Sequence, residues 1–268
     1  MKIVLFGKNG MLGSEFMKLL GDHELLAYDK EDVDLLDLGK TRSVILDAAP
    51  DFVINCAGYT AVDDAEANSD LALRLNCDAV ATMADACLGC SAKLIHFSTD
   101  YVFDGKDEGG YAEDAQSHPV NAYGQSKLLG EEAILESLCD FYIVRTSWLF
   151  GKNGPNFVEK MIELSRGRKS LNVVDDQFSC PTYSLDLAKA VVDNFLSGDK
   201  ESGIYHLTNS GSCSRYEFTK KILDVELLPV ASSTFNTPAA RPQFSVLLNT
   251  KLPHLRSWQD ALADYLSN

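Results

Sequence analysis

Short apolar runs alternate with helical patterns along the first half of the chain. Each apolar run is rich in β-branched or aromatic residues and is followed by polar or glycine residues, which is typical of buried strands. Between the runs, apolar residues recur at the spacing of amphipathic helices. The predicted strands are residues 2–6, 25–28, 52–55, 93–98 and 141–145, and the predicted helices are residues 12–20, 40–48, 67–88 and 121–137.

Such alternation is typical of a parallel sheet with helices on both of its faces. The predicted fold class is therefore α/β, with a Rossmann-like, doubly wound parallel sheet. Ligands of such sheets bind beyond the carboxyl ends of the strands. Gly7, Ala57, Ser98 and Trp148 each follow a predicted strand closely, so four separate segments are expected to meet at one edge of the sheet.

The second half of the chain is less regular. Its pattern predicts helices over residues 156–167, 182–196, 214–223 and 257–266, and strands over residues 171–174 and 203–208. Ser214 is placed to cap the third of these helices, and the last helix carries Trp258, Leu262 and Leu266 on one side. The length suits one compact α/β protein, or a large domain with a small lobe.

Composition narrows the choice of function. The net charge of −15 argues against non-specific nucleic-acid binding, which needs a basic surface. No apolar run approaches the ~20 residues of a membrane span, and the stretch before Gly7 is too short for a secretory signal. Seven scattered cysteines are typical of reduced thiols in a cytoplasmic protein. Cys87 and Cys90 have the spacing of a redox or zinc pair, but no second pair accompanies them.

A glycine-rich turn lies between the first predicted strand and the first predicted helix. Gly7, Gly10 and Gly13 are spaced three apart, unlike the G-x-G-x-x-G of many dehydrogenases. Glycine lets a ligand approach the backbone closely, and the amides of a helix N-terminus attract phosphate. A turn that serves only close packing is the alternative, but the position between a strand and a helix favours dinucleotide binding.

Tyr123 and Lys127 are four residues apart in a predicted helix and therefore share one face. A lysine ammonium near a tyrosine stabilises the tyrosinate and lowers the pKa of the phenol from its usual value of about 10. Ser98 and Thr99, at the end of a predicted strand, have hydroxyls that are placed to share the proton. Packing or solvation explains each residue alone, but together they indicate acid–base catalysis.

Further motifs occur in order along nearly the whole chain. They cover residues 7–13, 55–63, 98–105, 123–131, 144–148, 176–177, 181–182 and 241–242, together with Ser245. In these motifs the chain resembles the extended short-chain dehydrogenase/reductase superfamily and, within it, the dTDP-4-dehydrorhamnose reductases. The most specific motif is STDYVFDG at residues 98–105.

The resemblance implies roles for the residues at the sheet edge. Tyr123 would donate the proton, Lys127 would hold the nicotinamide ribose and lower the pKa of the tyrosine, and Thr99 would hydrogen-bond the substrate oxygen. The expected cofactor-binding residues are Gly7, Asn9, Gly10, Met11, Leu12, Gly13, Asp29, Lys30, Asp37, Leu38, Asn55, Cys56, Ala57, Gly58, Tyr59, Thr60, Asn76, Ser98, Tyr123 and Lys127.

The resemblance also implies a substrate site and two domains. Trp148 would face the sugar ring, and the guanidinium of Arg241 suits a pyrophosphate. Asp100 and Tyr101, which follow Thr99, would contact the substrate as well. The expected domains are an NAD(P)-binding Rossmann domain over residues 1–150, to which segments near 171–210 return, and a remainder over residues 151–268 that contributes a small substrate-binding lobe.

The implied activity is NAD(P)H-dependent reduction of a nucleotide-linked 4-keto-6-deoxysugar, and most closely of dTDP-4-dehydro-L-rhamnose to dTDP-L-rhamnose. One alternative is a nucleotide-sugar epimerase or dehydratase of the same fold, although dehydratases carry glutamate where this chain has Tyr101. Another is a non-catalytic regulatory subunit that keeps the fold. The expected partner is a small-molecule nucleotide sugar, and a homodimer is a further possibility.

Some choices stay open at this point. Asp29 suits a ribose 2′-hydroxyl and Lys30 suits a 2′-phosphate, so both NAD and NADP are compatible with the chain. Met11 replaces a glutamine that is usual in the family, and residues 179–180 interrupt its Gln-x-Gly-x-Pro-Thr stretch, which bears on substrate identity. Some relatives hold a divalent metal at a dimer contact. Only Glu15 stands near the relevant position, so no metal site is predicted, and Mg²⁺ stays a possibility.

Overall fold

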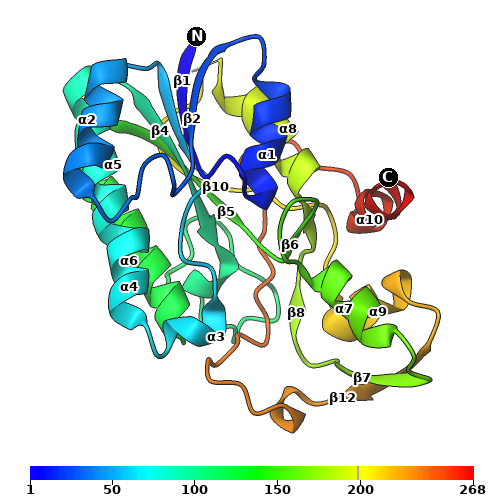
Figure 1. Ribbon diagram of the computed structural model, residues 1–268. Helices are drawn as coiled ribbons and strands as arrows, with labels where there is room; N and C mark the ends of the chain where they lie inside the picture. Colours follow the sequence, from blue (N-terminus) through cyan, green and yellow to red (C-terminus); the bar gives the residue numbers. More distant parts are fainter. Residues whose placement is uncertain (198) are drawn as a thin grey trace.

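The computed structural model describes residues 1–197 and 199–268. Six parallel strands form its central sheet in the order β10-β5-β4-β3-β1-β2 (Figure 1). They are β1 (Lys2–Phe6), β2 (Glu24–Tyr28), β3 (Phe52–Asn55), β4 (Lys93–Thr99), β5 (Asp140–Thr146) and β10 (Gly203–His206). The predicted parallel α/β sheet is confirmed. Every predicted strand, and every predicted helix except one, is confirmed to within two residues at each end.

Successive residues of β1 point to opposite faces of the sheet and enter two separate cores. Ile3 and Leu5 pack on the face covered by α1 (Met11–Leu19) and α8 (Ser184–Phe195). Val4 and Phe6 pack on the other face, which is covered by α2 (Leu38–Ala48), α5 (Ala79–Cys90) and α6 (Ala122–Glu136) (Figure 1). Because both faces are buried, these strands read in the sequence as continuous apolar runs.

The strand order reverses at β1, which lies between β2 and β3. At such a switch point the loops that follow the two central strands diverge and leave a crevice. Gly7 follows β1 with a φ of 81°, and a Cβ there would lie 2.9 Å from the backbone nitrogen of Ala57, which follows β3. Glycine is therefore required where the two loops pass each other.

The exception is the helix predicted over residues 67–88: this segment is helical from Ser69 to Cys90, but it is not a single regular α-helix. The chain instead forms the short helix α3 (Val62–Ala65), then α4 (Ser69–Leu73), a π-helical turn η1 (Arg74–Asp78) and α5. A π-turn holds more residues per turn than an α-helix and is frequent at functional sites. Here it turns the side chain of Asn76 inward, where the amide accepts from the backbone nitrogen of Tyr59 at 2.8 Å and donates to its carbonyl at 3.0 Å.

The second half of the chain adds short elements beside the main sheet (Figure 1). Three two-stranded sheets pair β6 (Leu149–Phe150) with β9 (Thr182–Tyr183), β8 (Phe178–Ser179) with β11 (Cys213–Ser214), and β7 (Ser170–Val174) with β12 (Glu226–Val230). Sequence analysis found only β7, because two-residue strands carry no periodicity and β12 is largely exposed and contains a proline.

A smaller lobe forms around β7 and β12. With α7 (Phe157–Ser165) and α9 (Arg215–Ile222), these strands enclose a core that contains Met161, Leu171 and Val173. Since β7 pairs with β12, the segment that rejoins the main sheet consists of α8 and β10 and starts later than residue 171. The division into two domains at residue 150 stays a prediction.

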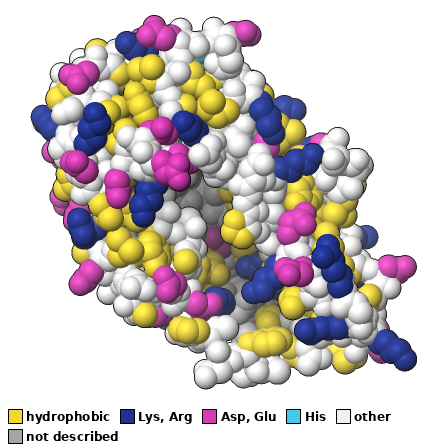
Figure 2. Space-filling model, in the orientation of Figure 1, with side chains coloured by type: hydrophobic (Ala, Val, Ile, Leu, Met, Phe, Trp, Pro, Cys, Tyr) yellow, Lys and Arg dark blue, Asp and Glu magenta, His cyan; other side chains and the backbone are white. Residues whose placement is uncertain are grey.

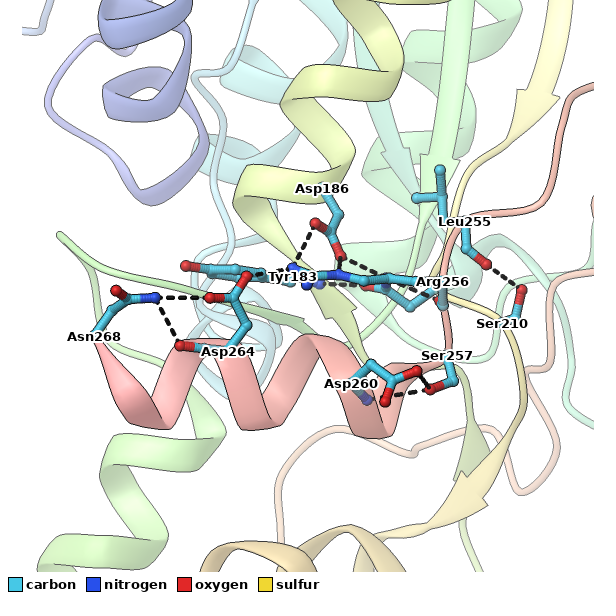
Figure 3. A network of polar contacts seen from close by, with 10 residues as sticks. Tyr183, Asp186, Ser210, Leu255, Arg256, Ser257, Asp260, Asp264 and Asn268 are labelled. Atoms are coloured by element: carbon cyan, nitrogen blue, oxygen red, sulfur yellow. Dashed lines mark hydrogen bonds and ion pairs between the residues drawn. The ribbon is translucent and has the colours of Figure 1, made fainter.

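A polar network fastens the carboxyl-terminal helix α10 (Trp258–Ser267) to the body of the protein (Figure 3). Arg256 donates to both carboxylate oxygens of Asp186 on α8, at 2.8 Å each, and to Asp264 on α10 at 2.6 Å. One guanidinium thus joins two helices that are distant in sequence.

Two details of the predicted helices are checked by side-chain contacts. Ser214 caps α9 in a reciprocal capping box with Glu217, as predicted. On α10, Trp258 and Leu262 are buried, whereas Leu266 is 44% exposed and does not belong to the buried face.

Two 3₁₀ turns complete the described elements, η2 (Asp100–Val102) and η3 (Ser232–Thr234). None of the helices in the described ranges is long and apolar enough to cross a lipid bilayer.

Candidate active site

A cleft of about 800 Å³ opens at the carboxyl ends of β1, β3, β4 and β5. Figure 2 shows it as a hollow between the main body and the smaller lobe. Its volume falls in the ~300–1,000 Å³ range of small-molecule and cofactor sites. Gly7, Ala57, Ser98 and Trp148 all line it, so the predicted convergence of four segments is confirmed.

Most of the predicted site residues line this cleft. The expected cofactor residues found there are Gly7, Gly10, Met11, Leu12, Asp29, Lys30, Asn55, Cys56, Ala57, Gly58, Tyr59, Thr60, Asn76, Ser98, Tyr123 and Lys127, and the expected substrate residues are Thr99, Asp100 and Trp148. Asn9, Gly13, Asp37, Leu38, Tyr101 and Arg241 are not among the lining residues.

Asn9 and Gly13 contact other parts of the protein rather than the cleft, and these contacts hold the glycine loop in place. The backbone nitrogen of Asn9 donates to the Asp29 carboxylate at 2.9 Å, which fixes the start of the loop to the end of β2. A Cβ on Gly13 would lie 2.0 Å from the carbonyl oxygen of Gly7. The third glycine therefore serves the packing of α1 against the loop.

Asp37 and Leu38 belong to the start of α2. Asp37 caps the helix by accepting from the backbone nitrogen of Lys40 at 2.9 Å, and Leu38 is its first residue. The cleft is lined instead by the four residues before them, Val33, Asp34, Leu35 and Leu36. Sequence analysis missed this segment, although the buried Val33 and Leu35 in a polar stretch after β2 were a usable signal.

Tyr123 stands in the first turn of α6, which Asn121 caps by accepting from the backbone nitrogen of Gly124 at 2.7 Å. Burial raises the pKa of the Tyr123 phenol, and the hydrogen bond with Thr99 opposes that shift in part. The expected lowering of this pKa by Lys127 is therefore not found in the protein alone. Burial is the main influence on this pKa, and Tyr123 keeps its proton at neutral pH.

Lys127 lies one helical turn further and is 5% exposed. Its Nζ donates to the carbonyl oxygen of Phe97 at 2.6 Å and lies 3.0 Å from Nε2 of His96. Burial lowers the pKa of Lys127 to about 8, and the Glu131 carboxylate opposes this shift. Glu131 is itself paired with Arg145 at 2.6 Å.

Asp100 joins the end of β4 to two distant segments. Its carboxylate accepts from the hydroxyls of Thr99 at 3.1 Å, Ser179 at 3.2 Å and Ser245 at 2.5 Å. Burial raises the pKa of Asp100 to about 6, and the Ser245 hydrogen bond is the largest opposing influence. The Asp100 side chain is 2% exposed and is held by all three donors. Because it cannot move freely, its hydrogen bond with Thr99 orients the Thr99 hydroxyl at the cleft.

Trp148 lines the cleft, and Arg215 packs against its ring. Trp148 has a φ of 41°, a left-handed conformation that costs a non-glycine residue about 1–3 kcal/mol and clusters at functional sites. The guanidinium carbon of Arg215 lies 3.6 Å from the centre of the Trp148 ring and 4.7 Å from that of Phe157. Sequence analysis missed Arg215, which carries no motif and only follows a helix cap.

Tyr101 and Arg241 lie next to the cleft. The ring of Tyr101 meets the ring of Tyr123 edge-on at 5.8 Å between centres. Arg241 donates to both carboxylate oxygens of Asp63 on α3, at 2.6 and 2.9 Å. The roles of both residues toward a substrate stay predictions.

The lining of the cleft fits a polar ligand such as a dinucleotide. The hydroxyls of Ser98 and Thr146 are buried and have no hydrogen-bond partner within the described residues, and both residues line the cleft.

For a metal the fit is poor. Across residues 1–197 and 199–268, no three His, Cys, Asp or Glu side chains are grouped to hold one, and Glu15 pairs with Lys18 at 3.0 Å.

Comparison with known proteins gives consistent matches. A family model described as the RmlD substrate binding domain matches residues 1–268. A dTDP-4-dehydrorhamnose reductase of Streptomyces griseus is 39% identical, covering 96% of this chain and 90% of the relative. A dTDP-4-keto-6-deoxy-D-glucose reductase of Streptomyces niveus is 36% identical, covering 96% and 93%. The crystal structure of dTDP-4-dehydrorhamnose reductase from Bacillus anthracis in complex with NADP is 37% identical with a TM-score of 0.94, covering 100% and 99%.

The parallel sheet, the glycine loop and the Tyr123–Lys127 pair, taken with these matches, define an NAD(P)-dependent oxidoreductase. Within that class, the chain belongs to the RmlD family of dTDP-4-dehydrorhamnose reductases.

Proposed function

We propose that this protein reduces the 4-keto group of dTDP-4-dehydro-L-rhamnose and so forms dTDP-L-rhamnose. The observation that carries the proposal is the meeting of Tyr123, Thr99 and Lys127 with the glycine loop in one cleft. The printed names of the two Streptomyces relatives, both reductases of dTDP-linked sugars, support the same type of reaction.

A reduced nicotinamide cofactor would supply the hydride for the ketone carbon. Gly7 and Gly10 admit a pyrophosphate to the backbone amides at the start of α1. We favour NADPH as the donor, because the Bacillus anthracis relative was solved with NADP. In addition, the Asp29 carboxylate already accepts from the backbone nitrogens of Asn9 and Lys30, at 2.9 and 2.7 Å, and is less available to a ribose 2′-hydroxyl.

Tyr123 would give its proton to the substrate oxygen as negative charge develops there. Burial raises the pKa of this phenol, so the proton is present at neutral pH. Thr99, whose hydroxyl donates to Asp100 in the free protein, would turn that hydrogen toward the same oxygen when the substrate binds. Lys127 would contact the nicotinamide ribose from beneath.

The substrate would lie between this catalytic group and the smaller lobe. Trp148 offers a ring face to the hexose, and Arg215 offers a planar guanidinium suited to a pyrophosphate. The 3.6 Å stacking of the two side chains keeps the guanidinium in place. The sugar and the pyrophosphate would then occupy neighbouring positions, one beside Trp148 and the other beside Arg215.

The other activities receive less support. A dehydratase would need an acid at the position of Tyr101, whose ring instead packs against Tyr123. Nothing in the site favours a regulatory subunit. A dTDP-4-keto-6-deoxy-D-glucose substrate is the second candidate, given the Streptomyces niveus relative. A homodimer and a cytoplasmic location stay predictions.

The test is a panel of dTDP-4-keto sugars incubated with NADPH or NADH, with cofactor consumption followed by absorbance. We expect turnover with the rhamnose precursor and a loss of about 10²–10⁴-fold in kcat for Tyr123→Phe. Tyr205→Phe, on the distant edge strand β10, serves as a control and should retain full activity. Full activity of Tyr123→Phe would contradict the catalytic assignment. Co-purification with a larger enzyme, without turnover of any sugar, would favour the regulatory alternative.

A further inference from the structure

A buried chain of polar side chains runs behind the cleft from β3 through β4 to α6. Asn55, His96 and Lys127 are 1%, 0% and 5% exposed. Asn55 and His96 are direct partners across the two parallel strands. Nδ2 of Asn55 lies 3.2 Å from Nδ1 of His96, and Nε2 of His96 lies 3.0 Å from Nζ of Lys127.

The contacts of Asn55 fix which atoms donate and which accept along this row of hydrogen bonds. The backbone nitrogen of Ala57 donates to Oδ1 of Asn55 at 3.0 Å. A backbone N–H can only donate, so the amide oxygen faces Ala57 and the amide NH₂ faces His96. Nδ1 of His96 must therefore accept. A neutral imidazole carries one N–H, so the hydrogen of His96 lies on Nε2, the atom that faces Lys127.

This tautomer constrains Lys127. An Nε2–H group that points at Nζ needs a lone pair there, which an uncharged amine has and an ammonium lacks. The amine still has hydrogens for the bond to the carbonyl of Phe97. A charged imidazolium is disfavoured, because burial lowers the pKa of His96 well below its usual value.

We propose that Asn55 and His96 are positioning residues that favour the uncharged form of Lys127 in the free protein, in which its Nζ accepts a hydrogen bond from His96. The ionisable groups that face Lys127 are His96 from β4, and Tyr123 and Glu131 from α6. The Glu131 carboxylate favours the ammonium, but Arg145 of β5 neutralises it at 2.6 Å. Burial acts in the same direction as the polar chain, since it lowers the pKa of Lys127 to about 8.

The consequence concerns Tyr123 and rests on the proposed function. By favouring the uncharged amine, Asn55 and His96 weaken the support that a Lys127 cation would give to a tyrosinate, and so they favour the protonated form of Tyr123. A protonated Tyr123 is ready to give a proton to a ketone oxygen and is not ready to take one from an alcohol. Asn55 and His96 thus favour the protonation state of Tyr123 that reduction of a ketone requires.

The first measurement is the tautomer of His96 by ¹⁵N NMR of the full chain labelled at histidine, without substrate, with His96→Gln to identify the signal. We expect hydrogen on Nε2 and none on Nδ1 between about pH 6 and pH 9. Hydrogen on Nδ1, or a ring that becomes an imidazolium in that range, would overturn the proposal. If His96→Gln does not fold, the wild-type spectrum alone is sufficient. The chain has five histidines, so their Nδ1 and Nε2 signals can be counted.

The second measurement is the titration of the Lys127 amine by ¹⁵N NMR of lysine-labelled protein. In His96→Gln the amide is free to rotate and present its oxygen to an ammonium, so the midpoint should rise by about one pH unit. His206→Gln changes another buried histidine, on β10, and should leave the midpoint unchanged. A wild-type midpoint in the ordinary lysine range near ~10.4 would overturn the proposal, as would equal midpoints in wild type and His96→Gln. Neither measurement uses turnover, so failure to reduce any sugar would count against the proposed function alone.

Discussion

The two walls of the cleft are built in different ways. On the cofactor side, Gly7, Ala57 and Ser98 lie at the carboxyl ends of neighbouring strands of one parallel sheet, and strand register alone brings them together. On the substrate side, Asp100 holds Ser179 and Ser245, which lie 79 and 145 residues further along the chain. The comparison teaches that a repeating scaffold places the first wall, whereas individual long-range contacts place the second.

The largest expected effect tests the scaffold side. Gly13→Ala puts a Cβ within 2.0 Å of the Gly7 carbonyl, so α1 and the loop must separate. We expect NADPH affinity to fall at least about a hundred-fold, or ~2.7 kcal/mol, measured by fluorescence titration. Gly21→Ala, where an added Cβ meets no atom within 4 Å, is the matched control. Equal affinities in the two variants would show that the close approach of loop and helix is not needed for binding.

The next effect concerns Asp100, which joins the two walls. Its folded pKa of about 6 lies above the unfolded value of 3.8, so the folded state binds the proton more tightly. The stabilisation is complete below about pH 4 and is lost as the pH rises through 6, an effect of about 3 kcal/mol. Asp100→Asn removes this dependence, so its free energy of unfolding should gain on the wild type by about that amount between about pH 4 and pH 7.

Urea unfolding at a series of pH values measures this difference. Asp22→Asn, the same exchange at an exposed turn, provides the control. If the difference between Asp100→Asn and the wild type stays constant over the whole range, the pKa of Asp100 is the same in the folded and unfolded states, and burial does not raise it.

The third effect belongs to the substrate wall alone. Arg215→Gln removes the guanidinium that stacks on Trp148, and with it the proposed contact to the pyrophosphate. We expect KM for the dTDP-sugar to rise about ten- to a hundred-fold, a loss of roughly 1.4–2.8 kcal/mol, while NADPH affinity is unchanged. Lys221→Gln, an exposed position on the same helix, should change neither. A parallel loss of cofactor affinity would mean that the two walls are not separable.

The same contrast explains what could be predicted from the sequence. Gly7, Tyr123 and Lys127 were predictable because periodic strands and helices place them, and Asn76 was visible as an amide inside a helical pattern. The π-turn that turns Asn76 inward was not predictable, because it depends on the fit of the amide to the backbone of Tyr59. The residues that contact the site residues from distant parts of the chain could not be predicted either.

Those hidden partners depend on tertiary contacts. Arg215 stacks on the ring of Trp148, which lies 67 residues earlier in the chain and has a positive φ. His96 sits inside an apolar strand, where its pattern indicates core packing, and only the register with Asn55 gives it a role. Residue type and spacing carry no information on such contacts.

The smallest effect sharpens the assignment of Arg241, which was expected to meet a pyrophosphate and is found paired with Asp63. The side chains are 21% and 43% exposed, so the pair contributes no more than about 1 kcal/mol. If Arg241 leaves Asp63 to bind the substrate, Asp63→Asn removes a competitor and KM should fall by up to about five-fold. Arg241→Gln should raise KM, and adding Asp63→Asn to it should change nothing further. Should Asp63→Asn instead raise KM as much as Arg241→Gln does, the ion pair would act as a clasp that closes the cleft, and Arg241 would not bind the pyrophosphate.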